Sequence, residues 1–184
     1  PELPFYVVEI APYLYESVSE PAKIREAQYI ATHALAHAGI VSTNDLVPEI
    51  ESTCIHPSNK RTIGERLGNL SLLETYDYDT IQAQSPSFNR LEIHNDSVIL
   101  FFENTYEGLQ HEGVIIGFEL GDSLHEFHPV FAQLGPGKNT ISIPIETGTT
   151  FRALRYCFKN YQVGNVKNSV GLPLIPFRTD FWTE

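Results

Sequence analysis

Close to its start the chain carries the run Phe5-Tyr6-Val7-Val8-Glu9-Ile10, which is apolar nearly throughout. Such a run is typical of a strand in the middle of a parallel sheet that is covered on both faces. The residue pattern then predicts a helix at about 21–36, a short strand at 39–43 and a helix at about 59–75. This alternation of strands and helices favours an α/β fold with a doubly wound sheet.

From about residue 85 the helical periodicity disappears, and short strand-like runs separated by turn signals replace it. Asn95-Asp96 lies between two such runs and is a hairpin signal. Six or more strands at intervals of about ten residues are typical of an antiparallel β-sandwich. We therefore predict an α/β domain over residues 1–84 and a β-sandwich domain over residues 85–184. The strand-like runs are Leu91–Ile93, Val98–Phe102, Val114–Leu120, Phe127–Gln133, Thr140–Ile145 and Phe151–Phe158.

The composition indicates a globular protein and argues against some partners. The chain has 184 residues, of which 42% are hydrophobic and 19% are charged. Its net charge of −11, from 23 acidic and 12 basic residues, would repel nucleic acid. No apolar run approaches the roughly 20 residues that cross a bilayer, and the first residues lack the pattern of a signal peptide. Because the chain contains no methionine, we expect a cut or processing site before Pro1 and further strands of the sheet upstream.

Neither the cysteines nor the paired histidines indicate a metal site. Cys54 and Cys157 fit no metal spacing, and we expect free thiols more than a disulfide, although the sequence does not decide between them. Two histidine pairs have the spacing of metal ligands, but no third ligand is evident for either pair. We therefore predict surface or partly buried histidines, no metal and no cofactor. The pairs are His33 with His37 and His125 with His128.

The loop between the second predicted strand and the second predicted helix carries the candidate chemistry. In open α/β sheets, the loops that leave the carboxyl ends of the strands form the active site. His56 lies in this loop, is followed by Pro57, and precedes Ser58, a candidate helix N-cap. A histidine in such a place is a candidate general base. The alternative is that His56 only closes the loop by hydrogen bonding.

The segment Ile55-His56-Pro57-Ser58-Asn59-Lys60, followed by Ile63-Gly64-Glu65-Arg66-Leu67, resembles the histidine block of the sialate O-acetylesterase family, within the SGNH (GDSL-like) hydrolases. The resemblance covers most of the chain in the right order. It implies that residues 1–84 are the carboxy-terminal part of an SGNH-type three-layer α/β hydrolase domain. Further segments also match the family: Pro4–Tyr6, Ala11–Tyr13, Arg25–Gln28, Thr43–Leu46, Arg155-Tyr156, Gly164-Asn165, Gly171–Pro173 and Pro176–Asp180.

This resemblance implies a serine esterase that removes O-acetyl groups from sialic acid. His56 would take the proton from a serine hydroxyl as that hydroxyl attacks the acetyl carbonyl. The chain contains no Gly-Asp-Ser-like or Gly-Gln-Ser-like block. We therefore expect the serine and the oxyanion-hole donors in a missing amino-terminal portion of the same protein, and we expect this chain alone to be inactive.

The third member of a catalytic triad is open. SGNH enzymes often carry an aspartate three residues before the histidine, but Thr53 occupies that position here. Glu51 and Asp45 are the candidates to orient the imidazole, and Glu51 is the nearer of the two along the chain. A Ser–His dyad oriented by a backbone carbonyl is the alternative.

The histidine block does not specify which sugar is bound, so an esterase for acetylated plant polysaccharide such as acetyl xylan is an alternative. A non-catalytic carbohydrate-binding fragment with an aromatic surface is a second alternative, although we expect most aromatic residues to pack the core. The last segment, Lys159–Glu184, is rich in loop signals, and we expect it to fold back over the first domain. The resemblance and the glycan substrate imply a secreted, periplasmic or lysosomal protein.

Overall fold

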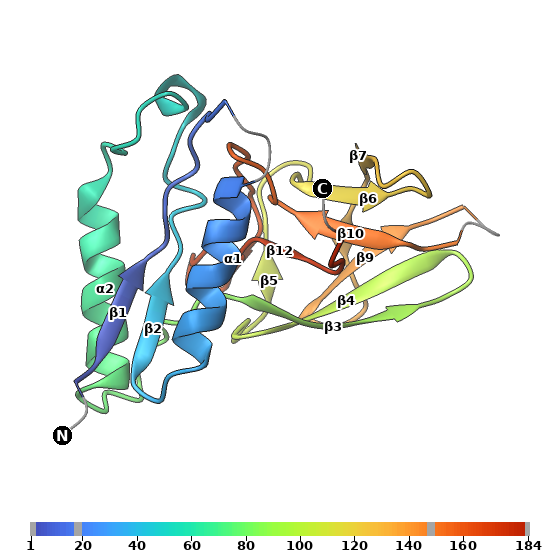
Figure 1. Ribbon diagram of the computed structural model, residues 1–184. Coiled ribbons are helices and arrows are strands. Elements are labelled where there is room, and N and C mark those ends of the chain that lie inside the picture. Colours follow the sequence, from blue (N-terminus) through green and yellow to red (C-terminus); the bar gives the residue numbers. More distant parts are fainter. Residues whose placement is uncertain (1–2, 17–19, 147–149, 183–184) are drawn as a thin grey trace.

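The computed structural model describes residues 3–16, 20–146 and 150–182. Strands and helices alternate in its first part, and antiparallel sheets make up its second part (Figure 1). The predicted combination of an α/β part and a β part is therefore confirmed. The α/β part ends with α2 at Glu74, and the β part begins with β3 at Ser87. None of the helices described is long and apolar enough to span a membrane.

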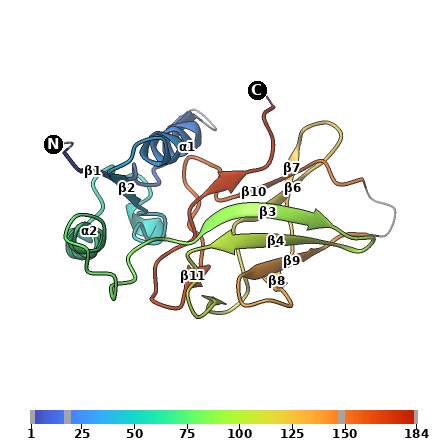
Figure 2. The same ribbon diagram turned by 90° about the horizontal axis from the view of Figure 1, so that it is seen from below.

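The α/β part has three layers. β1 (Phe5–Val8) and β2 (Ala38–Val41) pair in parallel, with Phe5 opposite Ala38 and Val8 opposite Val41. α1 (Glu20–His33) and α2 (Lys60–Glu74) lie on opposite sides of the two strands (Figure 2). Because parallel strands need a crossover connection, α1 follows β1 and brings the chain back to start β2. The carboxyl ends of both strands therefore lie at the same edge of the sheet.

α2 packs closely on the sheet through Leu70. A Cβ atom at Gly39 of β2 would lie only 2.9 Å from Leu70 Cδ2, so a side chain at this position would push the helix away. The two glycines of α2, Gly64 and Gly68, do not cause this close approach, because a Cβ atom at either position would meet nothing within 4 Å.

β1 is an open edge strand among the residues described. Its strand partner there is β2, and its other edge is unpaired. Phe5 is 60% exposed and Val8 is 38% exposed, so the strand is less covered than we predicted from its apolar sequence. Unpaired backbone groups beside exposed apolar side chains can template a further strand.

The β part consists of two four-stranded antiparallel sheets and one short pair of strands. One sheet has the order β3-β4-β9-β8, the other has the order β12-β10-β6-β7, and β5 pairs with β11. β3 and β4 form the hairpin predicted at Asn95-Asp96. The bounds are β3 Ser87–Ile93, β4 Ser97–Glu103, β5 Leu109–Gln110, β6 Phe118–Gly121, β7 Phe127–Pro129, β8 Gln133–Leu134, β9 Thr140–Pro144, β10 Ala153–Tyr156, β11 Lys167–Asn168 and β12 Phe177–Arg178.

Several predicted strands of the β part are shorter than expected. Only the end of the run Val114–Leu120 is in β6, and the run Phe127–Gln133 divides between β7 and β8. β11 and β12 lie in the final segment, which we had interpreted as loop. These strands have two residues each, too few to show a period in the sequence.

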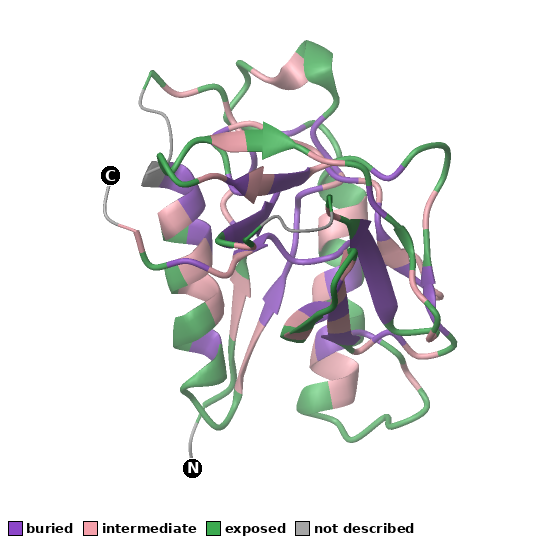
Figure 3. Cartoon of the chain, turned by 90° about the vertical axis from the view of Figure 1, so that its right-hand side faces the viewer, coloured by how far each residue is buried: buried purple, intermediate pink, exposed green. Residues whose placement is uncertain are grey.

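The two four-stranded sheets share one apolar core. Phe177 of β12 connects them, because its ring centroid lies 4.5 Å from that of Phe88 and 5.9 Å from that of Phe102, in the opposite sheet. Tyr156 and Phe158 are also buried. Figure 3 shows buried strand residues in the interior and exposed residues on the outer faces of the helices. These buried rings serve core packing, as we expected.

The final segment lies against the α/β part, as we predicted. Arg178 donates two hydrogen bonds to the Glu26 carboxylate of α1, at 2.9 and 2.8 Å. The Tyr161 hydroxyl donates to the Val47 carbonyl oxygen at 3.1 Å. The two parts of the molecule are therefore joined by polar contacts as well as by the connecting chain.

Candidate active site

The loop from Ser42 to Asn59 leaves the carboxyl end of β2 and is anchored by buried residues. Leu46 is 8% exposed and Val47 is fully buried. Beyond them the short helix η1 (Glu49–Glu51) lies at the outer end of the loop (Figure 1). Pro57 is buried again before α2 begins. The loop is thus held at both ends while its middle faces solvent.

His56 is exposed on this loop. Among the residues described, its imidazole forms no hydrogen bond. Only its carbonyl oxygen is bonded, by the Cys54 thiol at 3.2 Å. The structure therefore offers no support for the alternative in which the ring closes the loop by hydrogen bonding. An exposed imidazole is available to a group that approaches it from outside.

Glu51 closes the turn that contains His56. Its Oε2 accepts the backbone N–H of Ser58 at 3.0 Å. Hydrogen bonds from Ser58, through its side chain and its backbone, lower the pKa of the Glu51 carboxyl. The structure thus places Glu51 in contact with the residue two positions after His56, and no hydrogen bond joins Glu51 to the ring among the described residues.

The contact between Glu51 and Ser58 also changes the start of α2. We predicted Ser58 as the N-cap. The N-cap is instead Asn59, whose side chain accepts the backbone N–H of Thr62 at 3.2 Å. Since the N–H of Ser58 is bonded to Glu51, the chain enters the helix one residue later than expected.

Asp45 is the other acid that we predicted to orient the imidazole, but its carboxylate is bound by other residues. Both of its oxygens accept hydrogen bonds from Arg66 of α2, each at 2.8 Å. Lys167 Nζ of β11 lies 3.3 Å from Oδ2. The Asp45 side chain is only 6% exposed and the Arg66 side chain 8%. Asp45 therefore belongs to a buried ion pair that connects the loop, α2 and the β part.

A buried acid that we did not identify from the sequence lies at the same edge of the sheet. Glu9, 2% exposed, accepts hydrogen bonds from the Ser42 hydroxyl at 2.7 Å and the Thr43 N–H at 3.0 Å. Burial raises the pKa of the Glu9 carboxyl, although the nearby Arg25 opposes this effect. The signal for this buried acid in the sequence was that Glu9 is the one charged residue in the apolar run of residues 5–10. Ser42 is itself buried, so its hydroxyl is not presented as a nucleophile.

Three of the four histidines with the spacing of metal ligands contact a carbonyl oxygen, an aromatic ring or a carboxylate. His33 Nδ1 lies 2.8 Å from the Tyr29 carbonyl oxygen, and the His125 ring stacks on Trp182 with centroids 3.9 Å apart. His128 Nε2 lies 3.2 Å from Asp122 Oδ2.

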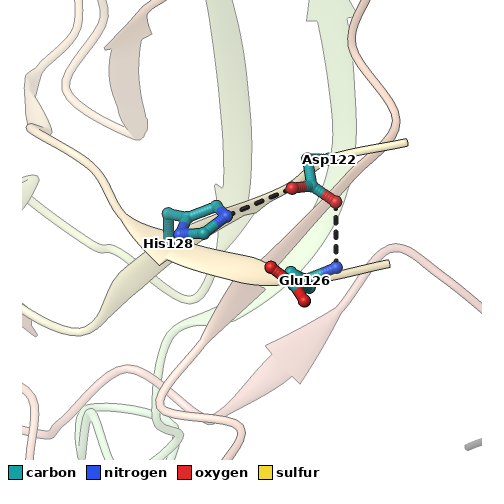
Figure 4. A group of neighbouring side chains, drawn as sticks. All are labelled: Asp122, Glu126 and His128. Atoms are coloured by element: carbon teal, nitrogen blue, oxygen red, sulfur yellow. Dashed lines mark hydrogen bonds and ion pairs between the residues drawn. The ribbon is translucent and has the colours of Figure 1, made fainter. Parts of the chain in front are cut away.

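Asp122, Glu126 and His128 lie close together at the β6–β7 turn (Figure 4). Asp122 Oδ1 accepts the backbone N–H groups of Leu124 and Glu126 at 2.8 and 3.0 Å. These bonds are those of an Asx-type turn, and they account for the position of the carboxylate. Glu126 and His128 are exposed and Asp122 is half-buried, and the hydrogen bonds of the turn account for the position of the Asp122 carboxylate without an ion.

Both cysteines are free. Cys54 is exposed in the His56 loop and Cys157 is buried in the core. Burial raises the pKa of the Cys157 thiol to about 12. The sequence left a disulfide between Cys54 and Cys157 open, and in the described structure the two residues form none.

Comparison with known proteins indicates a class for this arrangement. No protein-family model matches the sequence, and no curated protein matches it. Among solved structures, the chain is similar to a novel carbohydrate acetylesterase from Xanthomonas citri, with a TM-score of 0.85 and 29% sequence identity. The similarity covers 98% of this chain and 42% of that chain. It therefore includes both the His56 loop and the β part, and it supports a relation to esterases that act on carbohydrates.

Proposed function

We propose that this chain supplies the general base, His56, of a serine esterase that removes acetyl groups from carbohydrate. The exposed imidazole at the carboxyl edge of the parallel strands is the observation that carries this proposal. The likeness to a carbohydrate acetylesterase over 98% of the chain supports the reaction class.

In the proposed reaction, His56 accepts the proton of a serine hydroxyl while the serine oxygen attacks the acetyl carbonyl carbon. The imidazolium then gives this proton to the sugar oxygen as the bond between that oxygen and the acetyl carbon breaks. Water next attacks the acetyl-serine with His56 again as the base, which releases acetate and restores the serine hydroxyl. No atom changes its oxidation state in these steps, so the reaction needs no redox partner.

The serine and the oxyanion donors would come from an upstream portion of the same protein. The open edge of β1 is the place where a further parallel strand would continue the sheet. Active-site loops of neighbouring parallel strands meet at one edge. A strand added beside β1 would therefore bring its own carboxyl-end loop to the edge that carries His56. The SGNH-type domain and a secreted, periplasmic or lysosomal location belong to the same proposal.

The orientation of His56 would come from the loop itself. The Asp45 oxygens are engaged by Arg66 and Lys167, so Asp45 would have to leave a buried ion pair to reach the ring. Glu51 holds the turn through Ser58. We propose Glu51 as a positioning residue in a Ser–His dyad, with direct contact between Glu51 and the imidazole as the triad alternative.

The test uses the full-length protein with the substitution His56→Ala. Acetate release from acetylated sialic acid and from acetylated xylan should fall by at least about 10²-fold. His94→Ala, at an exposed histidine at the β3–β4 turn, is the matched control and should keep the parent rate. A His56→Ala enzyme with the parent rate on both substrates would refute the proposal. The ratio of the two parent rates separates the sialate esterase from the plant polysaccharide esterase.

A further inference from the structure

A cavity lies between the His56 loop and the β part. Its volume is about 420 Å³, within the range of roughly 300–1,000 Å³ of small-molecule sites. We call it the Asp45 pocket, and its lining residues are Asp45, Gln110, His111, Glu112, Gly164, Asn165, Lys167 and Gly171.

The Asp45 pocket lies at the edge of the sheet that carries His56. Asp45 is in the same loop as His56, close after β2. β5 points in the same direction as β1 and β2, so the segment after β5 lies at the same end of the molecule (Figure 1). A second cavity, of about 240 Å³, lies at the opposite end of β2, beside Ala38 and Gly39. Of these two cavities, the Asp45 pocket is the one at the edge of the sheet that carries His56.

The walls of the Asp45 pocket are fixed before a ligand binds. The Asn165 amide nitrogen donates to the carbonyl oxygens of Glu112 and Val114, each at 2.7 Å, and its oxygen accepts the Ile116 N–H at 3.0 Å. Gln110 Nε2 donates to the Asn168 carbonyl oxygen at 2.7 Å. These bonds hold the two β-part segments that face Asp45. A preformed wall reduces the entropy lost on binding.

The chemistry of the lining is that of a hydroxyl-binding site. No lining residue is aliphatic or aromatic apart from the two glycines and the imidazole of His111. His111 Nδ1 is buried and has no hydrogen-bond partner among the described residues. A buried polar atom without a partner is costly, and a sugar hydroxyl can donate to it or accept from it.

The charges of the pocket disfavour an anionic ligand. Arg66 and Lys167 are the neighbouring cations, and both already face the Asp45 carboxylate. Glu112 adds a second carboxylate to the lining. A bound carboxylate would therefore find no spare positive charge, and the net charge of −11 would repel it further. A hydroxyl group, in contrast, can both accept and donate hydrogen bonds, which suits a lining that offers the Lys167 ammonium and the Glu112 carboxylate.

We infer that the Asp45 pocket binds a neutral sugar unit of the acetylated glycan, next to the unit that carries the ester. The inference rests on the proposed function, because that function supplies the class of ligand, an acetylated glycan. It favours a neutral polysaccharide over a sialic acid chain as the substrate class.

The test measures binding by the full-length protein, by NMR on ¹⁵N-labelled protein, with probes that carry no acetyl ester and therefore undergo no catalysis. Xylohexaose is the neutral probe, and a galacturonic acid hexamer of equal length is the anionic probe. Xylohexaose should shift the backbone amides of residues 110–112 and 164–171 with a millimolar dissociation constant. His111→Ala and Glu112→Gln should each weaken this binding about tenfold. Glu126→Gln, at the exposed β6–β7 turn, should leave the binding unchanged.

Two results would overturn the inference: xylohexaose shifting none of these amides, or the galacturonic acid hexamer binding more tightly than xylohexaose. Neither result bears on the His56→Ala experiment. Failure of the sugar-binding inference can therefore be distinguished from failure of the esterase proposal, because the first is tested by binding and the second by acetate release.

Discussion

The Glu51 carboxylate accepts the backbone N–H of Ser58 at 3.0 Å and thereby closes the turn that carries His56. A glutamine can accept the same hydrogen bond through its side-chain oxygen, whereas an alanine cannot. The effects of these two substitutions therefore differ according to the role of Glu51.

If Glu51 positions the turn, Glu51→Gln should keep kcat in the full-length enzyme within about threefold, and Glu51→Ala should lower it about tenfold or more. The pH profile of kcat should keep its shape in Glu51→Gln. A triad acid behaves differently, because replacing it by the amide costs about 10⁴-fold in kcat. A loss of that size in Glu51→Gln, measured by acetate release, would assign Glu51 to the triad.

The ion pair between Asp45 and Arg66 should matter for stability. Both side chains are largely buried, so Asp45→Asn leaves the Arg66 guanidinium without its counter-charge. We expect a loss of about 3–5 kcal/mol in the free energy of unfolding, measured by urea denaturation. Glu65→Gln removes the exposed partner of Arg61 and should change stability by less than about 1 kcal/mol. Similar small effects of both substitutions would contradict the structural role of Asp45.

The two thiols should differ sharply in reactivity. Cys54 is exposed, and Cys157 is buried with its pKa raised to about 12. The thiolate is the reactive form, so a disulfide reagent should modify Cys54 in the native protein and both cysteines after denaturation. Cys54→Ser should abolish the native reaction. Rapid modification of Cys157 in the native Cys54→Ser protein would show that the core at β10 opens readily.

Glu9 should give stability a distinct pH dependence. Burial raises the pKa of this carboxyl above its ordinary value of 4.5, so the folded state binds its proton more tightly than the unfolded state. Between the ordinary pKa and the raised one, the folded state holds more protons. The contribution of Glu9 to stability therefore falls as the pH rises through this window.

Glu9→Gln cannot ionise, so the variant should gain stability relative to the parent as the pH rises above 4.5, the ordinary pKa of the Glu9 carboxyl. Urea denaturation at a series of pH values measures this difference. Glu16→Gln is a control at an exposed glutamate. Parallel pH curves for Glu9→Gln and the parent would mean that Glu9 keeps an ordinary pKa in the folded protein.

Local patterns in the sequence were sufficient for the order of elements in the α/β part and for one hairpin of the β part. The apolar run at β1 and the repeats that form α1 and α2 predicted the α/β part, and Asn95-Asp96 predicted the hairpin of β3 and β4. These features depend on residues that are neighbours along the chain, since strand and helix periods are short-range properties. The same holds for His56, whose place between a strand and a helix was visible before any contact was known.

Contacts between distant residues were decided only by the tertiary structure. Asp45 meets Lys167, and the Asp45 pocket joins segments from both parts of the molecule. Only its nearness to His56 favoured Glu51 over Asp45 as the candidate acid, because a sequence does not show which cation lies opposite a carboxylate. Packing brings those cations close, and burial then makes the pairing strong, so the partners of a charged side chain depend on the whole fold.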